Sequence, residues 1–330
     1  MKNRSLLLKA GMILVGLVIL SFVIWFSNPA KVADILAKSS LEYILMAFIL
    51  VNINMIIRTY KWKVLLKRKI SFKKLFPVQI FGMTLSNFTP GKVGEPIKAL
   101  LLRSHNGTPV SEGLSSIIWE RIADLVLLVI MATGLILVIS MKFEMIYIGL
   151  LSIGVFIAGI TALVLMVTHE HFGRRIFRFL TRFPIMKKLD KNFVDSFYRD
   201  ARVSKKSFLT CFMITTVAWM LDSIILYLCL IAVGITINPL LIIGIIAFSA
   251  LIGIASSLPG GIGSTEAVMI VLLTMLGADP IAAAAGVLVS RLISFWYGAG
   301  IGVLMFLHIA KTNQNIFSMD ISEKSDEVRN

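Results

Sequence analysis

The sequence predicts an all-α, polytopic membrane protein with inverted-topology repeats, about six spanning helices and two re-entrant hairpins. The first observation behind this fold class is composition: 57% of the 330 residues are hydrophobic, only 15% are charged, and the mean hydropathy is +0.88. Such values are typical of integral membrane proteins. The second observation is a duplicated motif, Pro-Gly-x-x-Gly followed by Glu, which occurs at residues 90–95 and again at residues 259–266.

The duplicated motif interrupts an apolar run in each half of the chain. Proline lacks a backbone donor and glycine disfavours helix, so each copy should break a helix. Irregular backbone at membrane depth is tolerated only where protein or a water-filled cavity satisfies its polar groups. A matching spacing supports a true repeat, because Arg121 follows Glu95 by 26 residues and Arg291 follows Glu266 by 25 residues. The expected break residues are Pro90, Gly91, Gly94, Pro259, Gly260, Gly261 and Gly263.

The first repeat, about residues 5–141, is expected to contain a span, a second span, a hairpin and a third span. The apolar run 75–89 is shorter than the roughly 20 residues that a spanning helix needs, so it is predicted to return through a second arm. Basic residues before the first span and after the second place both flanks in the cytoplasm. In chain order the elements are expected at residues 6–26, 41–60 (after an outer segment, 28–40), 75–89 with 96–103, and 112–141.

The second repeat, about residues 145–310, is predicted to have the same order of elements with the opposite orientation. The loop 169–206 is rich in Lys and Arg and should be cytoplasmic, which requires residues 75–103 to return rather than to cross. Residues 1–310 then form a single membrane domain, followed by a disordered cytoplasmic tail at 311–330, with both termini in the cytoplasm. The elements are expected at residues 145–168, 208–235, 240–257 with 265–276, and 280–309.

Charged residues inside the apolar helices are the candidates for function. A charge near the bilayer centre costs at least about 2.5–3.5 kcal/mol on insertion scales, so such residues usually face a partner or a wet cavity. The cations among them, together with the helix N-termini after the breaks, favour an anionic cargo such as a phosphate headgroup. The alternative is that the Glu–Arg pairs are structural ion pairs that only hold the hairpins in place. The candidate substrate-binding residues are Asn87, Lys92, Glu95, Arg121, Asp222, Glu266 and Arg291.

Other polar, aromatic and glycine positions allow more modest expectations. Asn52, Asn54 and Asp222 occupy the helices that precede the hairpins, where they either line the cavity or form hydrogen bonds between helices. Trp25, Tyr60 and Trp62 fit an interfacial aromatic belt better than a ligand cage. The segment 298–302 has Gly-x-x-x-Gly spacing, which suits close helix packing.

The net charge of +15 would suggest nucleic acid as a partner for a soluble chain. In a membrane protein, basic loops follow the positive-inside rule and attract anionic lipid headgroups, so no nucleic-acid binding is expected. The sequence contains no nucleophile elbow, phosphate-binding loop or paired acidic metal motif. We therefore expect no enzymatic activity, no cofactor and no metal ion.

Four groups of residues occur in a fixed order along the chain: Arg58-x-x-x-Trp62, Asn87-x-Thr89-Pro90-x-Lys92-x-Gly94-Glu95, Glu120-Arg121-x-x-Asp124-Leu125, and Pro259-Gly260-Gly261-x-Gly263-x-x-Glu266. Over about residues 5–310 they resemble the transmembrane region of lysylphosphatidylglycerol synthases and of the stand-alone flippase-like proteins that share it. The resemblance implies movement of an aminoacylated phospholipid or a polyprenyl-linked glycan precursor between leaflets. Family members with synthase activity carry an additional aminoacyl-transferase domain, and this chain is expected to be of the stand-alone type. Where relatives often have arginine, Lys92 keeps the charge but loses bidentate phosphate binding.

These observations favour a lipid translocase of the cell membrane, with anionic-headgroup lipids as its partners. With no nucleotide site, the driving force would be a lipid or ion gradient, or the protein would be a passive scramblase. One alternative is a secondary transporter for a small anion. Another is an accessory subunit that works with a separately encoded transferase. A membrane-embedded transferase is the remaining alternative, and it should show acidic metal-binding outer loops, whereas the predicted outer loops are short and poor in acids.

Overall fold

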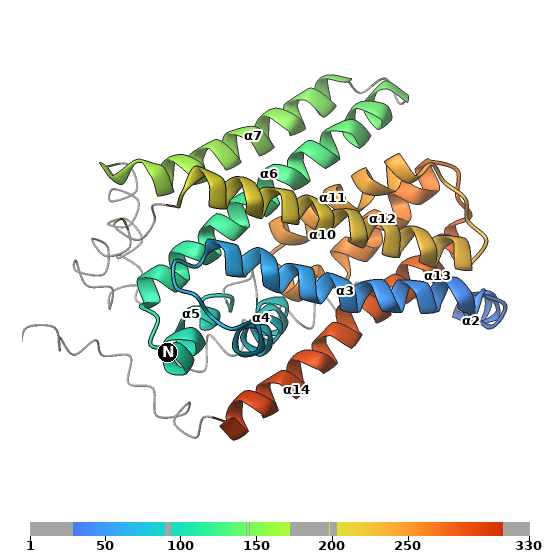
Figure 1. The fold of residues 1–330 in the computed structure, drawn as a ribbon. Coiled ribbons are helices and arrows are strands. Elements are labelled where there is room, and N and C mark those ends of the chain that lie inside the picture. Colours follow the sequence, from blue (N-terminus) through green and yellow to red (C-terminus); the bar gives the residue numbers. More distant parts are fainter. Residues whose placement is uncertain are drawn as a thin grey trace, which may run out of the picture.

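The computed structural model describes residues 29–89, 94–142, 144, 146–171, 198 and 203–312, and the regular elements within these ranges are all helical (Figure 1). The predicted first span at 6–26, most of the basic loop 169–206 and almost all of the tail lie outside the described residues. In chain order the elements are α2 (Pro29–Ala37), α3 (Leu41–Leu65), α4 (Phe72–Asn87), α5 (Ile97–Asn106), α6 (Val110–Lys142), α7 (Ile146–Thr168), α10 (Lys205–Ala232), α11 (Pro239–Ala255), η2 (Pro259–Gly261), α12 (Ser264–Met275), α13 (Pro280–Arg291), η3 (Leu292–Trp296) and α14 (Tyr297–Thr312).

Four helical segments of the described chain are long and apolar enough to cross a membrane. They are Leu41–Leu65, Val110–Lys142, Lys205–Ala232 and Pro280–Lys311, and they coincide with four of the six predicted spans. A fifth predicted span, residues 145–168, forms the helix α7, in which the apolar stretch found among the described residues, Gly149–Ala162, is shorter than those of the four spans. The protein is therefore an all-helical polytopic membrane protein, as the composition predicted.

The helices around the two breaks are short, as expected for hairpin arms. In the first half α4 and α5 pack together, and in the second half α11 and α12 do so. Figure 1 shows α4 and α5 near one end of α3, with α11, α12 and α13 gathered toward its other end. The re-entrant character of these hairpins and the inverted relation of the two halves stay predictions.

Two helices extend beyond the predicted elements. Within the segment predicted to lie outside, Pro29–Ala37 forms α2, and Ser40 after it donates its backbone N–H to the carbonyl of Ala232 at 2.9 Å, which joins this segment to the end of α10. The second span continues past residue 60 to Leu65 because Trp62 and Leu65 are buried against neighbouring helices rather than exposed at an interface. The aromatic-belt prediction for Trp62 is wrong: its side chain is fully buried and donates to Ser116 Oγ at 2.9 Å.

The last span is a composite of three helical segments. Pro280 occupies the first turn of α13, and the Asp279 carboxylate accepts hydrogen bonds from the backbone N–H groups of Ile281 and Ala282, a standard N-terminal cap. After Arg291 the backbone changes to a π-helix, Leu292–Trp296, before α14 continues. This π-helical segment was not predicted, because the apolar pattern runs through it without interruption.

The helices cross-pack between the two halves of the chain. The two helices before the hairpins, α3 and α10, lie side by side, while α6 packs on α11 and α14 packs on α4. The α4–α14 contact depends on glycine: Thr84 Oγ1 donates to the Gly298 carbonyl at 3.4 Å, and a β-carbon on Gly302 would overlap the Thr84 side chain. The predicted use of the Gly-x-x-x-Gly segment in close packing is confirmed.

Candidate functional site

The second break is a tight turn built on glycine. Gly260, Gly261 and Gly263 have φ values of 61°, 64° and 83°, in the left-handed region that side chains with a β-carbon disfavour. The turn leads directly into α12, and Glu266 Oε2 accepts the backbone N–H of Gly263 at 2.7 Å. This helix N-terminus is thus capped by the protein's own carboxylate, so the anion-binding role predicted for the N-terminus of α12 is already partly occupied.

The first break is described from Gly94 onward. Its N–H donates to Thr89 Oγ1 at 2.8 Å, a contact that joins the described residues on either side of the interval 90–93. The predicted break residues Pro90 and Gly91, and the predicted cation Lys92, lie in that interval, outside the described residues.

The two Glu–Arg pairs that the sequence spacing suggested are both present as ion pairs. Arg121 Nη2 lies 2.9 Å from Glu95 Oε1, and Arg291 Nε lies 2.5 Å from Glu266 Oε1. Arg291 also donates to the carbonyl of Gly260 at 3.0 Å, which ties the last span to the second break. Both ion pairs that the structural alternative requires are therefore present. Both arginines also line a cavity.

That cavity, of about 230 Å³, lies between the two breaks and is lined from both halves of the chain. We name it the central cavity. Its walls come from α3, α4, α6, α10, α11, α12, α13 and η3 and from both breaks. Of the seven candidate substrate-binding residues, five line it: Asn87, Glu95, Arg121, Asp222 and Arg291. A sixth, Glu266, is 3% exposed and reaches the cavity only through Arg291.

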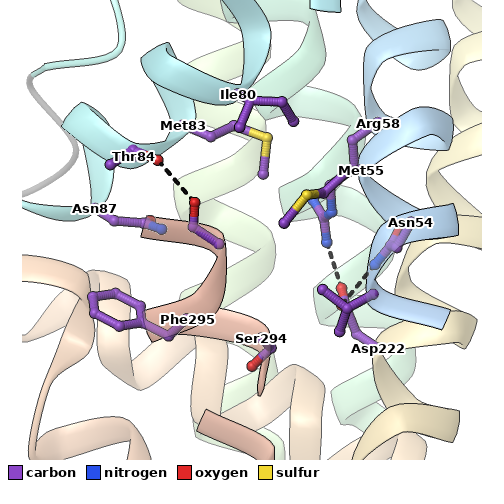
Figure 2. Close-up of a pocket in the computed structure, with 12 residues that line it drawn as sticks. Asn54, Met55, Arg58, Ile80, Met83, Thr84, Asn87, Asp222, Ser294 and Phe295 are labelled. Atoms are coloured by element: carbon purple, nitrogen blue, oxygen red, sulfur yellow. Dashed lines mark hydrogen bonds and ion pairs between the residues drawn. The ribbon is translucent and has the colours of Figure 1, made fainter. Parts of the chain in front are cut away.

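A smaller chamber of about 70 Å³ adjoins the central cavity and shares part of its lining (Figure 2). Here Asp222 accepts hydrogen bonds from Arg58 and from Asn54, the latter at 2.7 Å. The Arg58 guanidinium also lies 5.2 Å from the centre of the Trp219 ring. Both predictions for Asp222 are confirmed, because its side chain lines the cavity and its hydrogen bonds join α10 to α3. Asn52 takes part in another contact between helices, accepting from Tyr297 Oη at 2.8 Å.

A buried charge network surrounds the first ion pair. Lys61 Nζ lies 3.1 Å from Glu120 and 2.8 Å from Asp124, and Lys98 Nζ lies 2.9 Å from Glu120 and 3.1 Å from Glu95. With Arg121 included, three cations face three carboxylates, and both lysines are fully buried. We call these six residues the buried network: Lys61, Lys98, Arg121, Glu95, Glu120 and Asp124.

Local sequence explains how these buried charges are accommodated. Lys98 crosses from α5 to α6 over Gly82 of α4, where a β-carbon would overlap the lysine stem. Its ammonium group also donates a hydrogen bond to Gln79 Oε1 at 3.1 Å and lies 4.7 Å from the centre of the Trp62 ring. Such compensation is required, because an unpaired charge inside a membrane protein is strongly unfavourable.

The residues that sequence analysis missed are Arg58, Lys61 and Lys98. Arg58 lies near the end of the predicted second span and Lys61 directly after it, and neither was proposed as a site residue, although their spacing of three residues places both on one side of a helix. Lys98 follows Glu95 by three residues, the spacing of an ion pair within one helical turn, and this signal could have identified it.

The chemistry of the central cavity is set by three guanidinium groups, those of Arg58, Arg121 and Arg291. Arg121 Nε is buried and has no hydrogen-bond partner among the described residues. A guanidinium carries five N–H donors in a planar fork, and neither Arg121 nor Arg291 pairs through the whole fork with its carboxylate. The arrangement can therefore donate further hydrogen bonds to an anionic oxygen group in the cavity.

Comparisons with known proteins show which family the chain belongs to. The family model described as the lysylphosphatidylglycerol synthase TM region matches residues 13–302. A UPF0104 membrane protein of Methanothermobacter thermautotrophicus is 27% identical, covering 92% of this chain and 95% of its own length. UPF0104 membrane proteins of Pyrococcus horikoshii (25% identical; 91% and 96% covered) and Methanocaldococcus jannaschii (22%; 85% and 89%) are also similar. The chain belongs to the family of membrane proteins defined by the lysylphosphatidylglycerol synthase transmembrane region.

Proposed function

We propose that the protein is a lipid translocase, which moves an anionic or polyprenyl-linked lipid between membrane leaflets through the central cavity. The observation that carries the proposal is the convergence of Arg58, Arg121 and Arg291 on one cavity among membrane-spanning helices. Guanidinium groups bind phosphate with two parallel hydrogen bonds, and their charge is not lost at physiological pH.

The apolar part of the cavity lining suits an amphiphile. Ile246, Ala250 and Ile254 lie along α11 and present apolar groups to the same space that the arginines line. The volume of about 230 Å³ is below the roughly 300–1,000 Å³ of sites that enclose a drug-sized ligand. A headgroup fits there while the hydrocarbon chains stay in the bilayer.

Each arginine of the central cavity forms an ion pair with a carboxylate. Glu95, Asp222 and Glu266 each pair with one of them, so a substrate phosphate exchanges with a carboxylate rather than filling a vacant cationic site. Transport requires binding that is favourable enough for a substrate to enter and weak enough for it to leave. Such an exchange meets both requirements.

We further propose that the two halves are inverted repeats with re-entrant hairpins at 75–103 and 240–276. The matched packing supports this: α6 of the first half covers α11, and α14 of the second half covers α4. In this arrangement both termini are cytoplasmic. We also propose that the protein moves its lipid substrate without changing it chemically.

Leaflet exchange in proteoliposomes tests the proposal. Labelled aminoacyl-phosphatidylglycerol and a labelled polyprenyl-phosphate sugar are compared for wild type, Arg291→Gln and the matched control Arg68→Gln. Arg68 is an exposed arginine outside the cavity, with a side chain 53% exposed and 3.8 Å from Glu112. Exchange of one lipid, lost in Arg291→Gln and kept in Arg68→Gln, is expected. Absence of exchange for both lipids in wild type would reject the proposal and favour the small-anion transporter or the accessory subunit.

A further inference from the structure

Phe88, Phe295 and Trp296 form an aromatic cluster between the end of α4 and the π-helical segment. The ring centroids lie 5.7 Å apart for Phe88–Phe295, 6.4 Å for Phe88–Trp296 and 5.2 Å for Phe295–Trp296. Phe88 is 38% exposed and Trp296 is 43% exposed, whereas Phe295 is only 5% exposed. The cluster therefore has an outer face made by two rings and an inner face made by the third.

The inner ring stands next to the cationic interior. Phe295 lines the central cavity, and the Arg291 guanidinium carbon lies 4.5 Å from its ring centroid. The same ring fills the space where a β-carbon of Gly260 would lie, so it also contacts the second break. Phe295 thus separates the exposed aromatic rings from the Arg291–Glu266 ion pair.

The outer face is surrounded by apolar surface. Leu292 precedes Trp296 by one turn and is 62% exposed, and on α14 Val303, Leu304 and Leu307 are each at least half exposed. These residues belong to the span Pro280–Lys311, so their exposed side chains contact lipid rather than water. Trp296 belongs to the same span, so in a bilayer its exposed ring, with the adjoining Phe88 ring, would lie on the lipid-facing side.

We propose that a lipid headgroup reaches the central cavity sideways from the bilayer, through an opening between Phe88 and Trp296 that Phe295 closes. The inference rests on the proposed function and deepens it, because it fixes the substrate class as an amphiphile with a phosphate-bearing headgroup. The headgroup passes the aromatic rings to reach Arg291 while its hydrocarbon chains remain outside. A soluble anion would have no use for an opening in the lipid-facing wall.

The helical backbone beside this opening can change its conformation. Leu292–Trp296 is π-helical, and π-helical turns inside longer helices are often found at functional sites. Conversion of such a turn to α-helix shifts the register by one residue, which rotates the attached side chains by about 100° around the helix axis. This rotation would turn Phe295 away from Arg291 without unfolding the span. Figure 2 shows Phe295 and Ser294 on this segment, at the edge of the chamber next to Asn87.

A covalent block at the outer face tests the opening. Single-cysteine variants Trp296→Cys and Ile130→Cys are made in the full chain with the buried Cys211 and Cys229 replaced by alanine. Ile130 is the matched control because it is 59% exposed on α6 and does not line the central cavity. Both folded proteins are reconstituted in phosphatidylcholine vesicles that contain fluorescent phosphatidylglycerol. The introduced cysteine is then modified with pyrenyl maleimide. Modified Trp296→Cys should lose leaflet exchange, and modified Ile130→Cys should keep it.

The outcomes separate this inference from the proposed function. If both modified proteins exchange phosphatidylglycerol equally, the headgroup passes elsewhere and the opening is rejected, while the translocase proposal stands. If unmodified wild type shows no exchange of phosphatidylglycerol, the opening is judged by photo-crosslinking, and the translocase proposal is decided separately by the exchange of aminoacyl-phosphatidylglycerol and the polyprenyl-phosphate sugar. For that, a benzophenone amino acid replaces Trp296 or Ile130 in vesicles containing radiolabelled phosphatidylglycerol or radiolabelled phosphatidylcholine. Preferential adducts with the anionic lipid at position 296 are expected, and equal labelling of both lipids at both positions would overturn the inference.

Discussion

Replacing Glu120 with glutamine removes one negative charge from the buried network and keeps the shape of the side chain. Glu120 is 1% exposed, with Lys61 Nζ 3.1 Å from Oε1 and Lys98 Nζ 2.9 Å from Oε2. The variant leaves three cations, of which Lys61 and Lys98 are fully buried, facing two carboxylates. Removing one partner from a buried ion pair costs about 3–5 kcal/mol, because the remaining charge stays desolvated without compensation. We expect the free energy of unfolding of Glu120→Gln to fall by about that amount.

The assay is denaturant unfolding in detergent micelles, followed by circular dichroism. Asp34→Asn is the matched control, since it makes the same carboxylate-to-amide change in an exposed ion pair. Asp34 lies 2.7 Å from Lys38, and their side chains are 60% and 74% exposed. Such a pair contributes about 0–1 kcal/mol. A Glu120→Gln loss no larger than that of Asp34→Asn would refute the argument that burial makes the network sensitive to charge balance.

A double variant separates charge balance from loss of contacts. In Glu120→Gln with Lys98→Met, two cations face two carboxylates, and the apolar methionine replaces the buried lysine stem. We expect the double variant to be less destabilised than Glu120→Gln alone, since replacement of a whole buried ion pair by apolar groups is often tolerated. Losses that simply add would contradict this explanation.

Three other outcomes follow from the geometry. Gly260→Ala should lower the free energy of unfolding by more than Gly107→Ala: the two glycines have φ values of 61° and 65°, so both variants carry about 1–2 kcal/mol of left-handed strain, but only Gly260 also abuts an aromatic ring. Equal losses of unfolding free energy for the two variants in detergent micelles would contradict a role for the contact between Gly260 and the Phe295 ring. Asp222→Asn leaves Arg58 without its carboxylate partner and should slow lipid exchange without changing the circular dichroism spectrum; an unchanged rate would remove this pair from the site. Cysteines introduced at residues 177–190 should react with an impermeant reagent only from the cytoplasmic side, and labelling from outside intact cells would defeat the inverted topology.

The parts of the fold that the sequence predicted are those that hydropathy and spacing control. The spans near 112–141 and 208–235 match α6 and α10 closely, because long apolar runs leave few alternatives at membrane depth. The repeated Glu-to-Arg spacing pointed to Glu95–Arg121 and Glu266–Arg291, since a charge that must be buried needs a partner at a fixed distance along the fold.

The parts that could not be predicted depend on packing between distant segments. Trp62 was expected at an interface because sequence gives its position along a helix, not the identity of the helix that covers it. The same holds for Lys61, which appeared to belong to the basic flank although Glu120 and Asp124 on α6 neutralise it. The π-helical segment 292–296 follows α13 and precedes α14, and no residue type marks it in the sequence.

The two acidic residues of the Glu–Arg pairs each have a second partner. When Arg291 turns toward a substrate phosphate, Glu266 still accepts the Gly263 N–H at 2.7 Å, and when Arg121 does so, Glu95 still has Lys98 at 3.1 Å. Neither carboxylate would be stranded in a low-dielectric interior, which is the usual penalty for opening a buried ion pair. In the proposed translocation this second partner would lower the barrier to substrate capture and would let each half release and recover its arginine without local unfolding.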